Sequence, residues 1–257
     1  MLIPGLVSIT FRRLTPEEIL RRMQVCGLSA IEWGGDVHVP HGDTDRAHRV
    51  RELTEAARCT VASYGSYYRA GVEQTVSFDD VLATAEALGA PLIRVWAGNR
   101  GSDDASEEDR QRVADDARRI ADAAGERRIE IAFEYHGGSL TDTADSAVRL
   151  LAAVHRPNVR CYWQPPVGQD ESGQTHSLEA VLPWLANLHV FHWRADGERR
   201  PLREGRSRWE RWFALADRAE GTQRFAMIEF VRGDSLDAFA EDARVLRELA
   251  AARNREE

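Results

Sequence analysis

The chain has 257 residues, a net charge of −8 and 43% hydrophobic residues, a composition typical of one large or two small globular domains. The acidic balance argues against a nucleic-acid or anionic-membrane surface, because both demand a positively charged footprint. All 34 basic residues are arginine. The absence of lysine excludes a Schiff-base lysine, pyridoxal phosphate catalysis and a P-loop.

The sequence contains no run of about 18 apolar residues, so no membrane span is predicted. Its first residues, MLIPGLVSITFRRL, have no basic region ahead of an apolar run, which argues against a secretory signal. Cys26, Cys59 and Cys161 lie far apart without paired spacing. We therefore expect buried thiols in a reducing compartment, and a cytoplasmic protein.

Eight short segments of strand character alternate with helical patterns along the chain. The predicted strands are Gly5–Thr10, Leu28–Trp33, Thr60–Tyr64, Leu92–Trp96, Ile129–Tyr135, Val159–Gln164, Leu188–Trp193 and Phe225–Phe230. The predicted helices span residues 15–26, 43–58, 78–88, 106–124, 143–154, 178–185, 207–219 and 235–252, and the first opens with a capping box and a proline.

The strands recur roughly every 30 residues, a spacing that fits one strand and one helix per unit. Eight such units predict a single (β/α)8 TIM barrel over residues 1–257. The rival fold, a doubly wound open sheet, usually carries a glycine-rich turn after its first strand. None occurs in the stretch Ser8–Arg12.

Polar residues near the ends of the predicted strands are the candidates for chemistry, because a barrel carries its active site there. They are Glu32, Arg94, Trp96, Glu134, His136, Gln164, His189, His192 and Glu229. The last four strands are neighbours, so Glu134, Gln164, His192 and Glu229 should converge. Their carboxylate, carboxamide and imidazole donors suit one divalent ion: Mn²⁺, Mg²⁺, Co²⁺ or Zn²⁺.

Five stretches resemble the xylose isomerase-like TIM barrels, a family that includes sugar isomerases and epimerases, inosose dehydratases and endonuclease IV. They are IEWGGDVHVP (31–40), FEYHGGSLTDTADSA (133–147), YWQPP (162–166), HVFHWR (189–194) and MIEF (227–230). Members typically hold one metal ion with Glu, Asp, His and Glu from strands five to eight. The resemblance therefore implies Glu134, Gln164, His192 and Glu229 as ligands, and Glu134 and Glu229 as proton acceptor and donor.

Gln164 stands where the family usually has aspartate. Its carboxamide oxygen can coordinate an ion without contributing charge. The alternatives are that Gln164 only hydrogen-bonds a ligand, or that Asp170 or His176 replaces it. His189 is the alternative to His192.

The resemblance implies a metal-dependent isomerase or epimerase of sugars or keto-polyols, which removes a proton α to a metal-bound carbonyl. Loss of water from an inosose or keto-glycoside is the alternative, because it shares that first step. Two further hypotheses are a non-catalytic sugar-binding barrel and an endonuclease acting at abasic sites. The charge argues against the endonuclease and against nucleic-acid partners. The family's common dimers and tetramers leave a homo-oligomer open.

Five residues are candidate contacts for a small sugar-like substrate: His136, His38, Trp96, Glu32 and Arg194. The two histidines could instead hold loops, Glu32 could pair with an arginine, and Trp96 could pack against a helix. Arg194 begins an arginine-rich run that ends at Arg208. Because acids are interleaved with these arginines, a solvated loop is favoured over an anion site.

Overall fold

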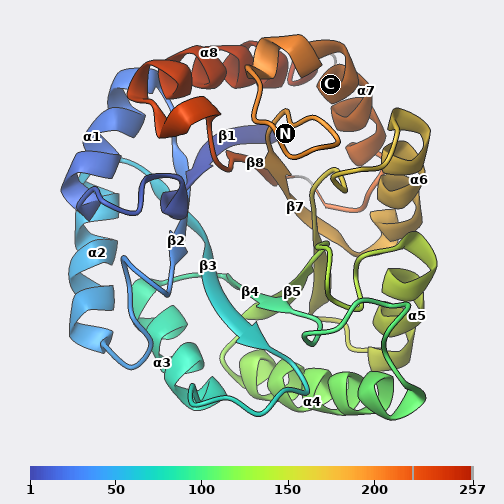
Figure 1. The fold of residues 1–257 in the computed structure, drawn as a ribbon. Helices are drawn as coiled ribbons and strands as arrows, with labels where there is room; N and C mark the ends of the chain where they lie inside the picture. The colour runs from blue at the N-terminus through green and yellow to red at the C-terminus, as the bar shows by residue number, and fades with distance from the viewer. Residues whose placement is uncertain (222, 256–257) are drawn as a thin grey trace.

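The computed structural model describes residues 1–221 and 223–255, and eight parallel strands close into a barrel in chain order (Figure 1). The strands are β1 Leu2–Val7, β2 Ala30–Gly34, β3 Thr60–Arg69, β4 Leu92–Trp96, β5 Glu130–Glu134, β6 Val159–Trp163, β7 Leu185–Val190 and β8 Arg224–Ile228. The predicted TIM barrel is confirmed.

An outer ring of helices surrounds the strands in Figure 1. The helices are α1 Pro16–Cys26, α2 Thr44–Ala56, α3 Phe78–Leu88, α4 Glu107–Glu126, α5 Ala144–Val154, α6 Glu171–Val181, α7 Arg206–Ala216 and α8 Leu236–Arg253. Short 3₁₀ turns, η1 Ser8–Phe11, η2 Leu182–Trp184, η3 Leu202–Gly205 and η4 Arg232–Asp234, complete the set. Local sequence starts several of these helices. Thr15 forms the predicted capping box with Glu18, for example, and Gly27 ends α1 in the left-handed conformation.

The apolar core has two parts. A large cluster lies between the strands and the helices, as expected for strands covered on their outer face. A smaller cluster fills the barrel itself, and its members are Val7, Ile9, Ala30, Ala62, Leu92, Ala132, Tyr162 and Met227. The barrel interior is therefore packed with side chains and is not a pore.

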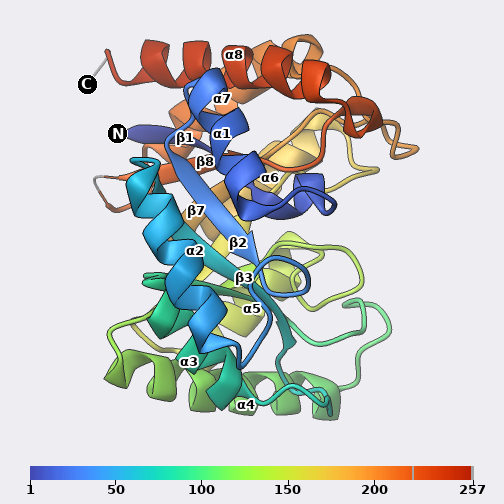
Figure 2. The same cartoon turned by 90° about the vertical axis from the view of Figure 1, so that its left-hand side faces the viewer.

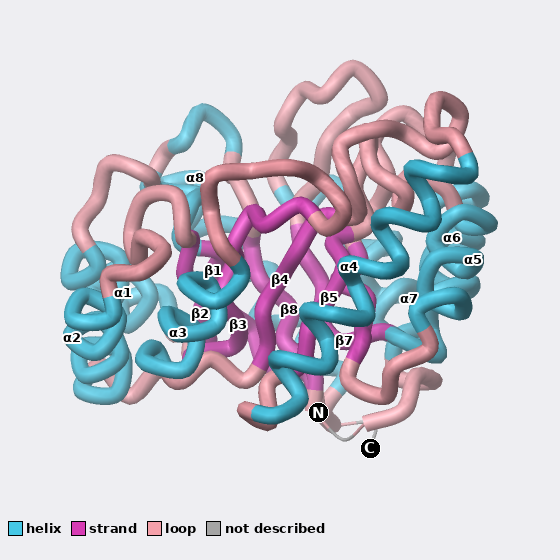
Figure 3. The backbone as a smooth tube through the Cα atoms, turned by 90° about the horizontal axis from the view of Figure 1, so that it is seen from below, coloured by secondary structure: helices cyan, strands magenta, loops and turns pink. Residues whose placement is uncertain are grey.

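The two ends of the barrel differ in their loops. Long loops extend beyond the carboxyl ends of the strands, whereas both termini lie at the opposite end (Figure 3). The side view shows α8 passing above the N-terminal strand on its way to the C-terminus (Figure 2). Functional side chains are therefore expected at the looped end.

The last third of the barrel differs from the prediction. The seventh strand was expected at Leu188–Trp193, but β7 starts at Leu185 and ends at Val190. The turn η2, with Pro183 near its start, ends α6 and lets the next strand begin earlier. The predicted helix 178–185 is also corrected: α6 starts at Glu171, because the Asp170 side chain caps it by accepting from Gly173 N.

All three cysteines are free thiols. Cys59 and Cys161 are buried and Cys26 is half-buried. Among the described residues, no helix is long and apolar enough to cross a membrane.

Candidate metal and active site

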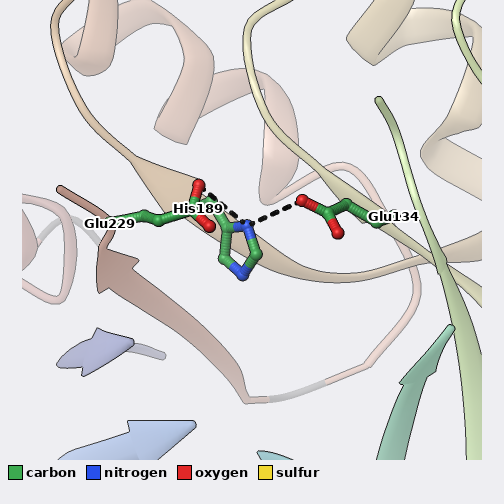
Figure 4. A group of neighbouring side chains, drawn as sticks. All are labelled: Glu134, His189 and Glu229. Carbon is green, nitrogen blue, oxygen red and sulfur yellow. Dashed lines mark ion pairs between the residues drawn. The ribbon is translucent and has the colours of Figure 1, made fainter. Parts of the chain in front are cut away.

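Three ionisable side chains meet at the carboxyl end of the barrel: Glu134 at the end of β5, His189 in β7, and Glu229 directly after β8. Each offers a ligand atom, and these atoms lie within 4.8 Å of one another. His189 Nδ1 lies 3.4 Å from Glu229 Oε2 and 3.8 Å from Glu134 Oε1 (Figure 4). All three side chains are buried. Two of the four predicted ligands, Glu134 and Glu229, are thus brought together.

The histidine in this cluster is His189, not the predicted His192. Because β7 ends at Val190, His192 falls in the loop after the strand. There it lines a separate cavity together with Glu204 and Arg208. The structure therefore favours the alternative histidine, and the reason is the three-residue shift of the strand.

Gln164, the third predicted ligand, lies beside the cluster. Its Nε2 donates to Glu134 Oε1 at 3.3 Å, and its Oε1 lies 3.4 Å from His189 Nδ1. This arrangement matches a side chain that hydrogen-bonds a ligand. Of the alternatives to Gln164, Asp170 caps α6 and His176 lies within that helix.

A second group of charges lies against the first, on the side of β2 to β4. Arg94 Nε donates to Glu32 Oε1 at 2.8 Å, and Arg94 Nη1 forms an ion pair with Glu134. Ser63 Oγ donates to the other oxygen of Glu32 at 2.7 Å. The guanidinium fits here because residue 65 is glycine: a Cβ at Gly65 would lie 2.8 Å from Arg94 Nη2. Glu134 thus belongs to both groups and joins them.

The proximity of these charges shifts several pKa values. Burial would raise the pKa of Glu32, but the cations Arg94 and His189 outweigh it and lower that pKa to about 2. Burial would lower the pKa of His189, but Glu229 and Glu32 outweigh burial and raise it. For Glu229, burial dominates and its pKa is raised. The buried carboxyls of Glu32 and Glu229 thus have pKa values shifted in opposite directions, because Glu32 has a close cation and Glu229 is dominated by burial.

A cavity of about 510 Å³ opens above the cluster. Its lining includes Glu134, Glu229, Gln164 and two of the predicted substrate contacts, Trp96 and His136. The ring centroids of Trp96 and His136 lie 4.2 Å apart. These two residues are therefore placed where a ligand would contact them.

The other three predicted contacts do not line this cavity. Glu32 is buried below it in the ion pair with Arg94. His38 is fixed within a loop, where its ring nitrogens lie 3.0 Å from Ser8 Oγ and 3.2 Å from Leu14 O. Arg194 is exposed, pairs with Glu198 and lines the cavity of His192. For all three, the alternative role weighed from the sequence is the one that the structure favours.

Sequence reasoning missed an aromatic wall of the cavity, formed by Phe191, Trp193 and Phe230. Two signals were available. Phe191 follows His189 by two residues, so pleat alternation would place both on one side, and Phe230 directly follows Glu229.

The fold and the cluster together define a class: a (β/α)8 barrel with a buried carboxylate–imidazole site at the carboxyl ends of its strands. The sequence model of the family described as "Xylose isomerase-like TIM barrel" matches residues 20–249. The chain belongs to that family.

Relatives within the family include a 3-dehydroshikimate dehydratase from Bacillus anthracis, 26% identical over 69% of each chain. Among solved structures, a probable 3-DHS dehydratase from Bacillus anthracis superimposes with a TM-score of 0.80, at 20% identity over 96% of this chain and 99% of that one. A D-psicose 3-epimerase from Clostridium cellulolyticum H10, solved with D-tagatose, has a TM-score of 0.69, at 14% identity over 98% and 96% of the two chains. A barrel from Mycobacterium smegmatis in complex with magnesium has a TM-score of 0.71, at 16% identity over 98% and 97%.

Proposed function

We propose that this chain is a divalent-metal-dependent enzyme that removes a proton α to the carbonyl of a small hydroxylated ketone and expels water. The observation that carries the proposal is the meeting of Glu134, His189 and Glu229 beneath a cavity. The 26% identity to a dehydratase supports loss of water as the outcome. Epimerisation or isomerisation is the second candidate, because it shares the first step and an epimerase has the same fold.

The donor set fits a divalent ion. Two carboxylates and an imidazole present ligand atoms within 4.8 Å of one another, and such donors suit Mg²⁺, Mn²⁺, Co²⁺ or Zn²⁺. The second ring nitrogen of His189 has no hydrogen-bond partner among the described residues, and it lies 3.6 Å from Glu32 Oε2. A carboxylate behind a ligand histidine is the usual support for metal binding. The ion would supply Lewis acidity to the substrate carbonyl.

The two glutamates supply the proton transfers. Arg94 and Gln164 both bind Glu134, which fixes its orientation as the proposed proton acceptor. Glu229, the second carboxylate of the cluster, is the proposed proton donor. In dehydration, Glu134 takes the α-proton, a carbon–carbon double bond forms, and the β-carbon–oxygen bond breaks. Glu229 protonates the departing hydroxyl, which leaves as water.

The test is turnover by the purified full-length chain with Mg²⁺ or Mn²⁺. The first substrate is 3-dehydroshikimate, followed by deuterium exchange from D₂O across a panel of ketoses and keto-inositols. We expect loss of water or exchange at one carbon, and no reaction in EDTA. If no compound reacts, and the chain purified without chelators contains no divalent ion, the non-catalytic sugar-binding barrel replaces this proposal.

A further inference from the structure

A second cavity, called here the His192 cavity, lies between the segments that lead into α6 and α7, which are neighbours in the outer ring (Figure 1). Its volume is about 490 Å³, within the range of about 300–1,000 Å³ that is typical of ligand sites. Gln169 and Trp193 line both this cavity and the central one, whereas Glu134 and Glu229 line only the central cavity. The two cavities therefore adjoin, and the proposed proton-transfer groups belong to one of them.

The charged side chains that line the His192 cavity already have partners. The ion pairs are Arg208 with Glu171 at 3.4 Å, Arg194 with Glu198 at 3.2 Å and Glu204 with Arg200 at 3.0 Å. The Asp170 side chain caps α6 by accepting from Gly173 N. A charged ligand would have to compete with one of these partners, so the lining does not select for an anion or a cation.

The polar groups without partners in this lining are neutral. Gln174 is only 8% exposed, and its Nε2 donates to Pro166 O at 3.1 Å, but its Oε1 has no hydrogen-bond partner among the described residues. Trp193 Nε1 is a buried donor that likewise has no partner in the part of the chain that the structure describes. An unpaired acceptor and an unpaired donor both cost free energy when buried. A ligand that carries both kinds of hydrogen-bonding group would relieve that cost.

His192 adds a third neutral polar group. Burial, and after it the nearby Arg208, lowers the pKa of His192 below its usual value. Near pH 7 the imidazole is therefore neutral, with one ring nitrogen that donates and one that accepts. The ring fits because residue 205 is glycine: a Cβ at Gly205 would lie 2.6 Å from His192 Nδ1.

We propose that the His192 cavity is a second binding site, which holds a neutral sugar through the Gln174 carboxamide, the His192 imidazole and the Trp193 indole. A hydroxyl group both donates and accepts, so one sugar ring supplies the donor that Gln174 Oε1 lacks and the acceptor that Trp193 Nε1 lacks. The inference does not depend on the proposed reaction, because none of these three residues holds the proposed metal ion or transfers a proton.

The test is a titration of the full-length chain in EDTA with the methyl glycosides of glucose, mannose and galactose, followed through the indole N–H signals by proton–nitrogen NMR. We expect a saturable shift of the Trp193 signal, which Trp193→Phe identifies. The Trp96 signal should stay in place, because Trp96 lines the central cavity and not the His192 cavity. The Trp33 signal is a second reference, since Trp33 Nε1 donates to Thr54 Oγ1 at 3.1 Å, remote from both cavities.

Gln174→Met removes the unpaired acceptor with little change in size. It should weaken binding of the best-bound glycoside by about 3- to 10-fold, and so should His192→Ala. Gln24→Met is the matched control, because the Gln24 amide also donates to a backbone carbonyl, that of Ala57 at 3.1 Å, but does not line the cavity. Circular dichroism verifies that each variant folds, and if Gln174→Met does not, His192→Ala decides the test.

The inference is overturned if none of the three glycosides binds saturably, or if both cavity variants bind like the Gln24 control. A shift of the Trp96 signal in place of the Trp193 signal would assign the sugar to the central cavity and count equally against it. Methyl glucuronide binding more than about 10-fold tighter than the glucoside would show an anion site instead. His189→Ala, which tests the proposed metal ion, should leave sugar affinity unchanged, so the failure of one proposal is distinguishable from the failure of the other.

Discussion

Two groups of buried charges lie side by side in this barrel. They differ in the hydrogen-bond and ion-pair partners of their carboxylates. On the side of β2 to β4, Glu32 is fully engaged by Arg94 and Ser63. On the side of β5 to β8, Glu134, His189 and Glu229 converge and line or adjoin a cavity. A buried carboxylate held on both oxygens, such as Glu32, supports the structure, whereas two carboxylates that converge with a histidine beside a cavity can bind a cation.

Substitutions in the group that lines the cavity should have the largest effect on turnover. Glu134→Gln and Glu229→Gln each remove a proton-transfer group, so we expect turnover to fall by about 10³-fold or more. Steady-state kinetics with Mg²⁺ on 3-dehydroshikimate measures this. Glu130→Gln is a matched control, because Glu130 begins the same strand and pairs with Arg160 away from the cavity. If turnover falls by less than 10-fold in both variants, other residues carry out the proton transfers.

On the supporting side, Arg94→Met should act chiefly on stability. It leaves Glu32 and Glu134 buried without their shared cation, and breaking a buried ion pair typically costs about 3–5 kcal/mol. Urea unfolding measures the change in the free energy of unfolding. Arg51→Met, which breaks an exposed pair with Glu55, should cost less than about 1 kcal/mol. Equal small losses in both variants would show that Arg94 does not hold the two groups together.

His189 and His192 allow a direct test of the earlier start of β7, which decides which histidine faces the cluster. His189→Ala should weaken Mn²⁺ binding by more than about 100-fold, because even groups that only orient a ligand contribute about 10–100-fold. His192→Ala should leave Mn²⁺ affinity unchanged, since His192 lines another cavity. Calorimetric titration with MnCl₂ distinguishes them, and the reverse pattern would restore His192 as the ligand.

Asp242 extends the comparison to a buried carboxylate outside both groups, in α8. It accepts from Leu202 N at 2.8 Å, and burial raises its pKa from 3.8 to about 6. The folded state therefore binds the proton more tightly than the unfolded state, and stability should fall as the pH rises from about 4 to about 6.

Asp242→Asn keeps the acceptor oxygen without the charge. At pH 7.5 it should raise the free energy of unfolding by about 1–3 kcal/mol, at about 1.4 kcal/mol per pKa unit. The gain should shrink towards pH 4, which urea titrations at several pH values would reveal. A gain that does not vary with pH would mean that burial does not disfavour the charge of Asp242.

The sequence by itself determined the barrel, because eight strand–helix units with their own caps leave few other ways to bury eight apolar strands. It also placed Glu134 and Glu229 at strand ends, and the structure brings both to one point. The choice between His189 and His192 needed tertiary structure. Both are histidines near one strand, and only its pairing with β6 and β8 sets where it starts and which residue faces inward.

Barrel closure likewise determines the partners of Glu32 and the aromatic wall of the cavity. Arg94 reaches Glu32 across 62 positions in the chain, and only closure of the barrel and the space above Gly65 bring the two together. Phe191 follows β7 and Phe230 follows β8, so no pattern within a single strand–helix unit marks them as one surface. Local sequence fixes which residues face one side of a strand, whereas barrel closure decides which of those residues meet.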